Sequence, residues 1–495
     1  MSTPTGADAD VDGRESRGAS TGVAEGVRGQ RSADAAAAAS MADGTGARGR
    51  RPPRADEAPV VGKLLQLMRD PDGYYEDVGY GYDADAVAYS VNRTEAVMLT
   101  HPSYVQSVLV EEAAAFRKGE VLSRAFDGLA PNGLVASEGE EWARDRALVQ
   151  PAFYRERVES YADEMVGAAT RTADAWADAH VVRVDEDAKD LTLEIIARTM
   201  FGTDLSGDGE VIGEAADAIL SRTSPMNLSS YLPVWVPTPS NRRFVRVMRD
   251  LRETMTALVA ERRASDGDVG DDLLSILADA EYADGTSMDR ERLQDHLVTF
   301  VFAGHETTAL LLTWTLWELA LNPDVQSKLH AELDDVLDGG TPTADAVRDV
   351  EYLRAVVDES TRLHPPAYNV FREAKRDVTV GPWEISEGTT VTTPQLVVHR
   401  DERWYDDPLS FDPDRWTAAM RDALPEYAHY PFGGGPRSCI GNRFATLEAN
   451  LILATILSRF EVDAVTDEVG YSFSATLQPD RPVKLRFRER SNREH

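Results

Sequence analysis

The chain contains a single cysteine, Cys439, within residues 431–442, which read Pro-Phe-Gly-Gly-Gly-Pro-Arg-Ser-Cys-Ile-Gly-Asn. A lone thiol has no disulfide partner in the chain, and zinc or iron–sulfur cages need several soft ligands. Residues 443–458 follow with the apolar periodicity of a helix. A cysteine just ahead of a helix N-terminus lies near unpaired N–H groups and the positive dipole end, which favour thiolate. Such a thiolate suits the axial ligand of a haem iron, although the thiol taken alone favours a buried free cysteine behind a flexible loop.

The residues around the cysteine fit the pattern Phe-x-x-Gly-x-Arg-x-Cys-x-Gly, with Phe432, Gly435, Arg437, Cys439 and Gly441 at the defined positions. This pattern resembles the cysteine-ligand loop of the cytochrome P450 family at every defining position. The resemblance implies haem b bound through Cys439, with Phe432 packed near the sulfur and Arg437 paired with a haem propionate. A forked guanidinium suits a carboxylate in that role.

A second chemical stretch is Ala-Gly-His-Glu-Thr-Thr at residues 303–308, in the middle of a long apolar segment. Glycine followed by polar residues weakens a helix locally, and taken alone the stretch could be a kink with a hydrated face. It resembles the family's oxygen-activation groove, and more narrowly that of bacterial fatty-acid hydroxylases. The resemblance implies that Gly304 lets dioxygen approach, that Thr307 supplies a hydroxyl near it, and that Glu306 connects it to solvent protons. We therefore expect Thr307 and Glu306 to be catalytic, whereas His305 is not assigned as a ligand.

Three further residues are expected to bind the cofactor. Trp142 and Arg146 are four apart on one predicted helix face, which by itself is a common surface pair. They resemble the family's helix whose Trp and Arg donate to haem propionates. Arg372, ten residues after Arg362, stands where the family often places another propionate partner.

Glu359 and Arg362 are three apart on a predicted helix, and such pairs usually add only a few tenths of a kcal/mol. With Arg415 they resemble the family's Glu-x-x-Arg helix and the arginine that completes its salt-bridge network. We expect these three residues to be structural.

Charge restricts the partners. The chain has 85 acidic and 52 basic residues, a net charge of −33, and only six lysines. Such a surface repels the phosphates of nucleic acids and anionic membranes. Dense carboxylates with little lysine also favour a salt-rich, halophilic cytoplasm, where screening relieves self-repulsion, although an ordinary acidic protein remains the alternative.

The fold is expected to be mainly α with a smaller β region, as in cytochromes P450. Residues 1–55 are low in large apolar side chains and predict a disordered tail, and residues 56–495 predict one haem-thiolate domain. A strand pair is expected within 85–99, and a long helix from a Ser287 cap to about Asn322. Residues 231–240 predict a stiff, sticky loop, because three prolines lie among large apolar residues.

No secretory signal is recognised, and the apolar zone 297–321 contains His305 and Glu306, which indicates a buried helix and a cytoplasmic protein without a transmembrane segment. The resemblance implies a monooxygenase that inserts one oxygen atom into a small apolar substrate. No reductase sequence is recognised, so electrons are expected from a separate ferredoxin-like donor. A peroxide-driven peroxygenase and a non-catalytic haem-thiolate sensor are the alternatives, and neither needs the Glu306–Thr307 pair.

Overall fold

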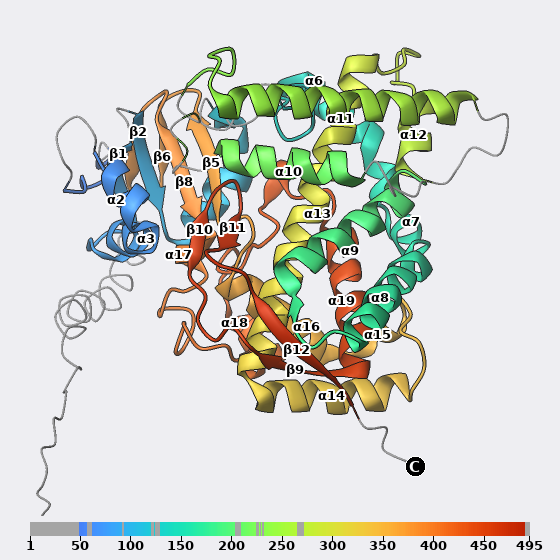
Figure 1. Cartoon of the computed structure of the whole chain (residues 1–495). Helices are drawn as coiled ribbons and strands as arrows, with labels where there is room; N and C mark the ends of the chain where they lie inside the picture. The colour runs from blue at the N-terminus through green and yellow to red at the C-terminus, as the bar shows by residue number, and fades with distance from the viewer. Residues whose placement is uncertain are drawn as a thin grey trace, which may run out of the picture.

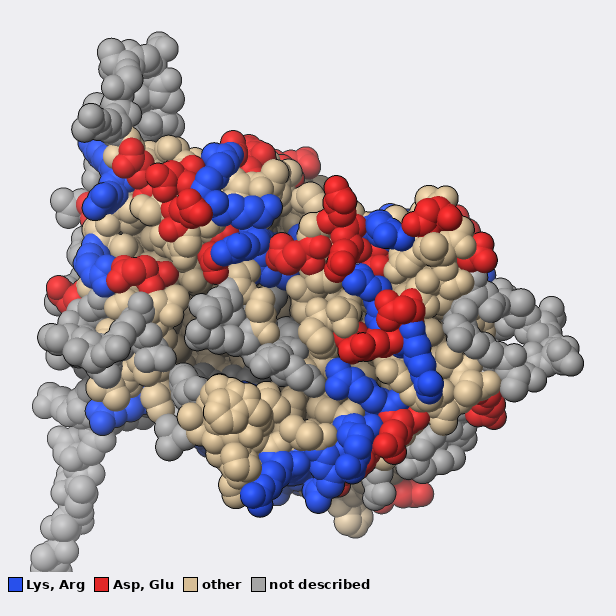
Figure 2. Space-filling view, turned by 90° about the horizontal axis from the view of Figure 1, so that it is seen from above, with Lys and Arg blue, Asp and Glu red and all other residues tan. Residues whose placement is uncertain are grey.

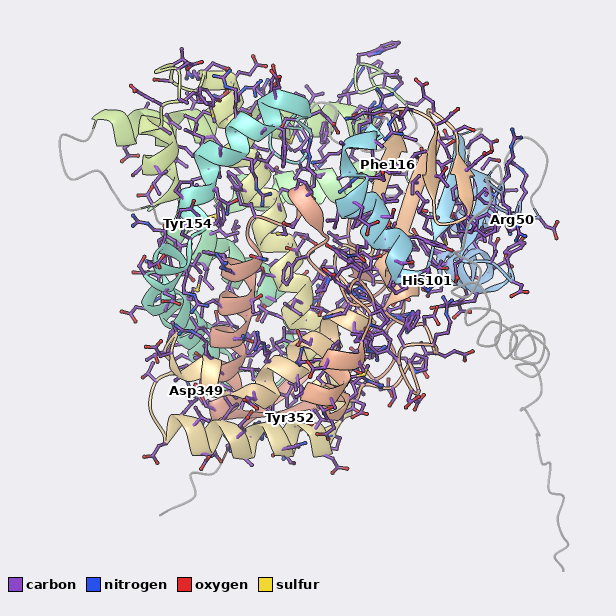
Figure 3. The ribbon with its side chains drawn as sticks, turned by 180° about the vertical axis from the view of Figure 1, so that it is seen from behind. Arg50, His101, Phe116, Tyr154, Asp349 and Tyr352 are labelled. Atoms are coloured by element: carbon purple, nitrogen blue, oxygen red, sulfur yellow. The ribbon has the colours of Figure 1, made fainter. Side chains whose placement is uncertain are left out.

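The computed structural model describes residues 49–490, apart from 57–61, 92–93, 120–122, 124–128, 203–208, 224–226, 228, 230–231 and 265–271. Most of the predicted tail, residues 1–48, lies outside the described residues. Its last part does not fit the prediction, because the backbone N–H of Arg50 donates to Pro382 O at 2.7 Å and that of Ala88 donates to Pro53 O at 2.8 Å. Arg50 lies at the outer edge of the sheet region (Figure 3). Packed structure therefore begins ahead of residue 56.

The helices are α2 (Leu64–Arg69), α3 (Pro71–Tyr80), α4 (Pro102–Gln106), the π-helix η1 (Ser107–Glu111), η2 (Ala113–Ala115), α6 (Gly139–Val149), η3 (Gln150–Phe153), α7 (Arg155–Glu159), α8 (Ala162–Ala177), α9 (Val184–Met200), α10 (Gly209–Thr223), α11 (Pro239–Ala264), α12 (Leu273–Asp279), α13 (Arg290–Leu321), α14 (Pro323–Leu337), α15 (Ala346–Asp349), α16 (Glu351–Leu363), α17 (Gln395–Val398), η5 (Pro413–Arg415), α18 (Ala418–Ala423), η6 (Gly435–Arg437) and α19 (Asn442–Arg459). The strands are β1 (Ala86–Val91), β2 (Thr94–Leu99), β3 (Phe116–Arg117), β4 (Val182–Arg183), β5 (Asn369–Ala374), β6 (Val378–Val380), β7 (Trp383–Ile385), β8 (Thr390–Pro394), β9 (Phe460–Ala464), β10 (Tyr471–Phe473), β11 (Leu477–Pro479) and β12 (Lys484–Glu489).

Helices form most of the molecule, and the largest sheet lies to one side of them (Figure 1). That sheet has the strand order β1-β2-β8-β5-β3, in which β2 and β8 are parallel and the other neighbours are antiparallel. The expected strand pair is β1 with β2, joined in antiparallel register from Ala86 opposite Leu99. The prediction of a mainly α fold with a smaller β region is confirmed.

Helix α13 runs through the middle of the helical part (Figure 1) and is about 48 Å long at 1.5 Å per residue. Its N-cap is Asp289, whose carboxylate accepts from the N–H of Arg292 at 2.9 Å, so the predicted cap at Ser287 is wrong by two residues. Its end at Leu321, with Asn322 as C-cap, is as predicted. The helix is long and apolar enough to cross a membrane, but 83% of its most apolar window is buried inside the protein, as expected of a core helix.

Gly304 brings α13 close to α9. A Cβ at this position would lie 2.6 Å from Ile196 Cδ1, so the end of the Ile196 side chain would have to shift to admit a larger residue. The sequence-based interpretation was that this glycine lets dioxygen approach. The structure shows in addition that it packs closely against α9, and the approach of dioxygen stays a prediction.

A buried ion network joins α16 to the segment before α18. The Glu359 carboxylate accepts from Arg362 Nε and Nη2, each at 2.8 Å, and from Arg415 Nε at 2.9 Å. Trp416 Nε1 and the N–H of Asp412 also donate to it, at 2.9 and 3.0 Å. Burial alone would raise the pKa of Glu359, but the hydrogen bonds and charge of Arg362, with the charge of Arg415, outweigh burial and lower it.

Removing this carboxylate should strongly destabilise the fold. Glu359→Ala leaves two buried guanidinium groups without their anion, and we expect the free energy of unfolding to fall by about 3–5 kcal/mol. The measurement is denaturant unfolding beside Glu461→Ala, whose carboxylate forms an exposed pair with Arg488 at 3.5 Å. The control should change stability by no more than about 0.5 kcal/mol. Equal small losses in both variants would refute the structural role of Glu359.

Candidate active site

The cysteine loop has a backbone that requires glycine. Gly433 and Gly435 have φ of +68° and +63°, in the left-handed region. A Cβ on Gly435 would lie 1.9 Å from Leu109 O of η1. The turn can therefore pack against that π-helix only because residue 435 has no side chain. The loop then closes on itself, because the N–H of Cys439 donates to Phe432 O at 2.9 Å. The backbone thus brings Phe432 and Cys439 together three residues before α19 begins.

The Cys439 side chain is accessible and at the same time closely surrounded. The free thiol is exposed, yet protein surrounds it closely enough that burial raises its pKa. The N–H of Gly441 and the charge of Arg146 act in the opposite direction. The expected thiolate-stabilising groups are therefore present, but burial outweighs them in the protein alone. The thiol is therefore open to a ligand although protein surrounds it on most sides.

Four cations surround this loop. Burial lowers the pKa of the Arg146 and Arg372 guanidinium groups. Burial, together with the positive charges of Arg372 and Arg146, also lowers the pKa of Arg437 to about 10, although the Glu138 carboxylate acts in the opposite direction. Burial and the charges of Arg437 and Arg372 lower the pKa of the Lys118 amine well below its usual range. The nearest carboxylate, Glu138, is 3.8 Å from Arg437 Nη2. In the described part of the chain, Arg437 Nη1 is buried without a hydrogen-bond partner.

Helix α6 is joined to the loop by two of its predicted site residues. Arg146 Nη1 donates to Ser438 O at 2.8 Å, and its Nε donates to Gln150 Oε1 at 3.2 Å. The Arg437 guanidinium lies over the Trp142 ring, 3.9 Å from its centroid. The structure therefore brings both α6 residues to the cysteine loop, as the sequence predicted.

The arrangement fits a ligand with two carboxylates, such as haem with its propionates. Charges withdrawn from water need partners, and of these four half-buried basic side chains Arg437 has a carboxylate, that of Glu138, at 3.8 Å. The orphaned Arg437 Nη1 supplies a donor for such a group. An enclosed thiol beside these cations supplies the soft ligand that haem iron takes.

The polar turn of α13 contains the two predicted catalytic residues. Thr307 Oγ1 donates to Ala303 O at 2.8 Å, a back-bond that often bends a helix. Glu306 is fully buried. Its Oε1 accepts from Gln478 Nε2 and lies 3.6 Å from Lys189 Nζ, whereas its Oε2 has no hydrogen-bond partner in the part of the chain that the structure describes.

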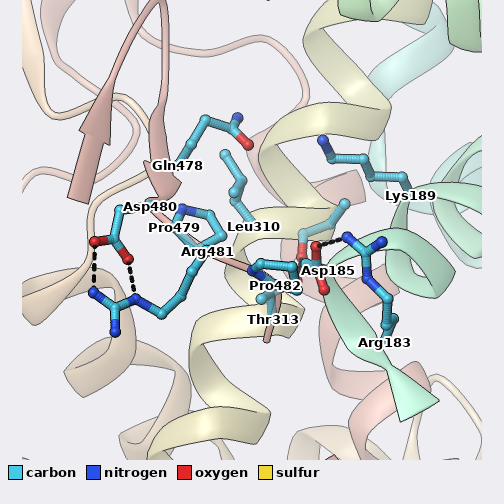
Figure 4. Close-up of a pocket in the computed structure, with 11 residues that line it drawn as sticks. Arg183, Asp185, Lys189, Leu310, Thr313, Gln478, Pro479, Asp480, Arg481 and Pro482 are labelled. Atoms are coloured by element: carbon cyan, nitrogen blue, oxygen red, sulfur yellow. Dashed lines mark hydrogen bonds and ion pairs between the residues drawn. The ribbon is translucent and has the colours of Figure 1, made fainter. Parts of the chain in front are cut away.

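A cleft of about 230 Å³ adjoins this turn. Its wall includes Leu310 and Thr313 of α13, with Lys189 of α9 and Gln478 of the β10–β11 hairpin. In Figure 4 the polar ends of Lys189 and Gln478 point toward each other from the two sides of the cleft. The residues that hold Glu306 therefore also line a cleft, which gives water a route toward a buried acid.

The sequence analysis missed three residues: Lys118 near the cysteine loop, and Lys189 and Gln478 at Glu306. Lys118 and Lys189 are two of only six lysines in an acidic chain, and this scarcity is the one signal that could have drawn attention to them. Gln478 is 172 residues from Glu306 and belongs to a different element, so no local spacing connects the two.

A family model described as Cytochrome P450 matches residues 52–487. The chain is 32% identical to pentalenene oxygenase of Streptomyces avermitilis, over 88% of this chain and 96% of that protein. It is 32% identical to cyclooctat-9-en-7-ol 5-monooxygenase of Streptomyces melanosporofaciens, over 82% of this chain and 88% of that protein. A cytokinin hydroxylase of Arabidopsis thaliana is 31% identical over 80% and 79% of the two chains. Match length, relatives and the haem-compatible site agree: the chain belongs to the cytochrome P450 family and is a haem-thiolate monooxygenase.

Proposed function

We propose that the protein binds haem b through Cys439 and inserts one atom of dioxygen into a small apolar hydrocarbon. The main supporting observation is the accessible thiol beside four half-buried basic side chains, of which Arg437 has a buried Nη1 without a hydrogen-bond partner among the described residues. The substrate class rests on the names of the bacterial relatives, which describe oxygenation of pentalenene and of cyclooctat-9-en-7-ol.

In this proposal the four basic side chains together bind the two haem propionates. Arg437, whose Nη1 has no partner among the described residues, takes one carboxylate, and Arg146, Arg372 and Lys118 complete the cradle. Trp142 supports the Arg437 guanidinium from below its plane. Phe432 would pack near the sulfur, a role that the backbone bond from the N–H of Cys439 to its carbonyl supports by keeping the two residues together. Haem, when bound, supplies the iron at which dioxygen is reduced and the O–O bond is broken.

Glu306 and Thr307 move protons in this scheme. Gln478 and Lys189 hold Glu306 Oε1 on the side of the cleft, whereas Oε2 lies 3.8 Å from His305 Nε2 and accepts no hydrogen bond from the described residues, so that it could take a proton from water or pass one on. The Thr307 hydroxyl now donates to Ala303 O, and rotation about χ1 would release it from that carbonyl for another partner. Lys189 and Gln478 are positioning residues, because they act on the acid alone.

We further propose a separate ferredoxin-like electron donor that docks beside the cysteine loop in the cytoplasm. Arg443 is exposed in the first turn of α19, four residues after Cys439, and is the basic residue of this loop that haem would not use. A small iron–sulfur protein with an acidic face suits such a local contact.

The first test concerns ligation. Because Cys439 is the only thiol, Cys439→Ser should abolish the absorbance of the reduced carbon monoxide complex at about 450 nm, which thiolate ligation produces. Far-ultraviolet circular dichroism should remain that of the parent protein, which separates lost ligation from lost fold. A variant that keeps this band would overturn the assignment of the ligand.

The second test concerns the polar turn. Thr307→Ala, reduced by a ferredoxin with its reductase, should consume electrons at nearly the parent rate while product per electron falls severalfold and peroxide release rises. The matched control is Thr199→Ala in α9, whose buried hydroxyl makes the same kind of back-bond to Ile195 O at 2.7 Å. Unchanged coupling in Thr307→Ala would leave this turn a structural role only. Failure of any ferredoxin to reduce the parent protein would refute the proposed donor.

The third test concerns a halophilic habitat, which the acidic excess and six lysines support. The screening length falls from about 10 Å at 0.1 M salt to about 3 Å at 1 M, so concentrated salt should relieve repulsion among the carboxylates. We expect the midpoint of thermal unfolding to rise by at least a few degrees between about 0.1 M and about 2 M potassium chloride, together with haem retention. A flat or falling midpoint would count against the habitat.

A further inference from the structure

Asp145 of α6 is a buried acid that the proposed chemistry does not use. It is 1% exposed and lies between Trp142 and Arg146, the two α6 residues that reach the cysteine loop. Its Oδ1 accepts from the Tyr282 hydroxyl at 2.6 Å, and its Oδ2 accepts from Arg292 Nη1 at 2.7 Å. Because Tyr282 precedes α13 and Arg292 belongs to its first turn, this carboxylate ties α6 to the start of α13.

The most deeply buried partner of Asp145 is His296 of α13. The imidazole is fully buried, and its Nε2 lies 3.2 Å from Asp145 Oδ2. Its Nδ1 has no hydrogen-bond partner among the residues that the structure describes, so Asp145 is the polar group that compensates the burial of this ring. Burial alone would raise the pKa of Asp145, but the contacts with His296, Tyr282 and Arg292 outweigh burial and lower it. The carboxylate is therefore charged at neutral pH.

A chain of ring contacts beside this pair holds the other end of α6. His296 is stacked with Phe300, one turn further along α13, with 6.3 Å between the ring centroids and 20° between the planes. Phe300 in turn lies 5.7 Å from Phe153 of η3, the helix that directly follows α6. Both phenylalanines are buried. The segment formed by α6 and η3 is thus fixed to α13 at two places, through Asp145 and through Phe153.

The face of α13 that carries His296 also carries the polar turn. His296 and Thr307 are eleven positions apart, which places them on the same face within about 20° and about 16.5 Å apart along the helix axis. On α6, Arg146 directly follows Asp145, and its Nη1 donates to Ser438 O, the carbonyl next to Cys439. The contacts of Asp145 with α13 therefore decide where Arg146 stands relative to both the thiol and the polar turn.

Burial distinguishes this pair from the charges on the surface. Acidic and basic side chains lie side by side over the face in Figure 2. An exposed pair such as Arg144 with Asp284, at 3.1 Å, contributes little to stability, because water screens it. Asp145 and His296 are withdrawn from water, so replacing either one leaves the other buried without its partner.

We propose that Asp145 and His296 act as one positioning unit, which aims Arg146 and Trp142 at the haem propionates. Arg146 already acts on the thiol, since its charge opposes the effect of burial on the pKa of Cys439. Partners that lie behind the ligands of a bound metal typically change its affinity about 10- to 100-fold, and we expect effects of this size here. The inference rests on the proposed binding of haem at Cys439 and adds the residues that place the cradle.

The experiment measures the rate at which haem leaves the full-length holoenzyme for excess apomyoglobin. Asp145→Ala and His296→Ala should each speed release by about tenfold or more. The double variant should release haem no faster than the faster single variant, because two members of one unit do not add. In an Arg146→Ala background, Asp145→Ala should change the rate by less than about twofold, because Asp145 acts through Arg146. A merely structural role would leave the effects of Asp145 and Arg146 additive.

The matched control is Asp187→Ala, which removes a hydrogen bond of 2.7 Å from Trp176 of α8 to α9, where Trp176 packs on Phe487 of β12. This control should lower the midpoint of thermal unfolding while haem leaves at the parent rate. Asp145→Asn keeps the shape of the side chain without its charge, so it replaces the alanine variant if that variant does not retain haem, and it should also release haem faster than the parent.

Additive effects in either double variant would overturn the inference. So would haem release from Asp145→Ala, or from Asp145→Asn in its place, that is no faster than from the control. A parent protein whose reduced carbon monoxide complex lacks the band at about 450 nm would instead refute the proposed function, so the two failures are distinct.

Discussion

The structure depends on an imbalance of buried charge around the cysteine loop. Arg146, Arg372, Arg437 and Lys118 come from α6, β5, the loop itself and the segment after β3, and burial lowers the pKa of each. Four separate parts of the chain therefore meet at a place that is unfavourable for all of them until an anion arrives. Binding of a dicarboxylate cofactor should then stabilise the fold, since a ligand that binds only the native state adds its binding free energy to stability.

The central helix α13 meets two opposed demands. Its flanks are buried on nearly all sides, which requires regular, tight packing, and Gly304 achieves this against Ile196. The next turn must nevertheless hold a buried carboxylate and a hydroxyl that can change partners. The side chains that make this tolerable come from outside the helix, as Lys189 and Gln478 supply the charge and hydrogen bond that Glu306 lacks within it.

Local patterns were enough to predict the cysteine loop, α19, the end of α13 and the α6 pair, because each is written within a few consecutive residues. The predictions that failed depended on contacts between distant segments or on a choice between two similar residues. Asp289 and Ser287 are both good caps, and only the tertiary packing selects between them. Residues 50–55 contain nothing apolar enough to signal order, yet they hydrogen-bond to the sheet edge. Gln478 reaches Glu306 through the packing of a hairpin on α13, which no spacing in the sequence encodes.

Net charge illustrates the same limit for function. A net charge of −33 acts only within about a screening length of the surface, which is long at low ionic strength and short in concentrated salt. At moderate salt a partner therefore senses only the charges close to the contact, such as the exposed arginines Arg242, Arg243 and Arg246 of α11. Composition therefore predicts colloidal behaviour and salt response, whereas the local placement of charges decides what happens at contact.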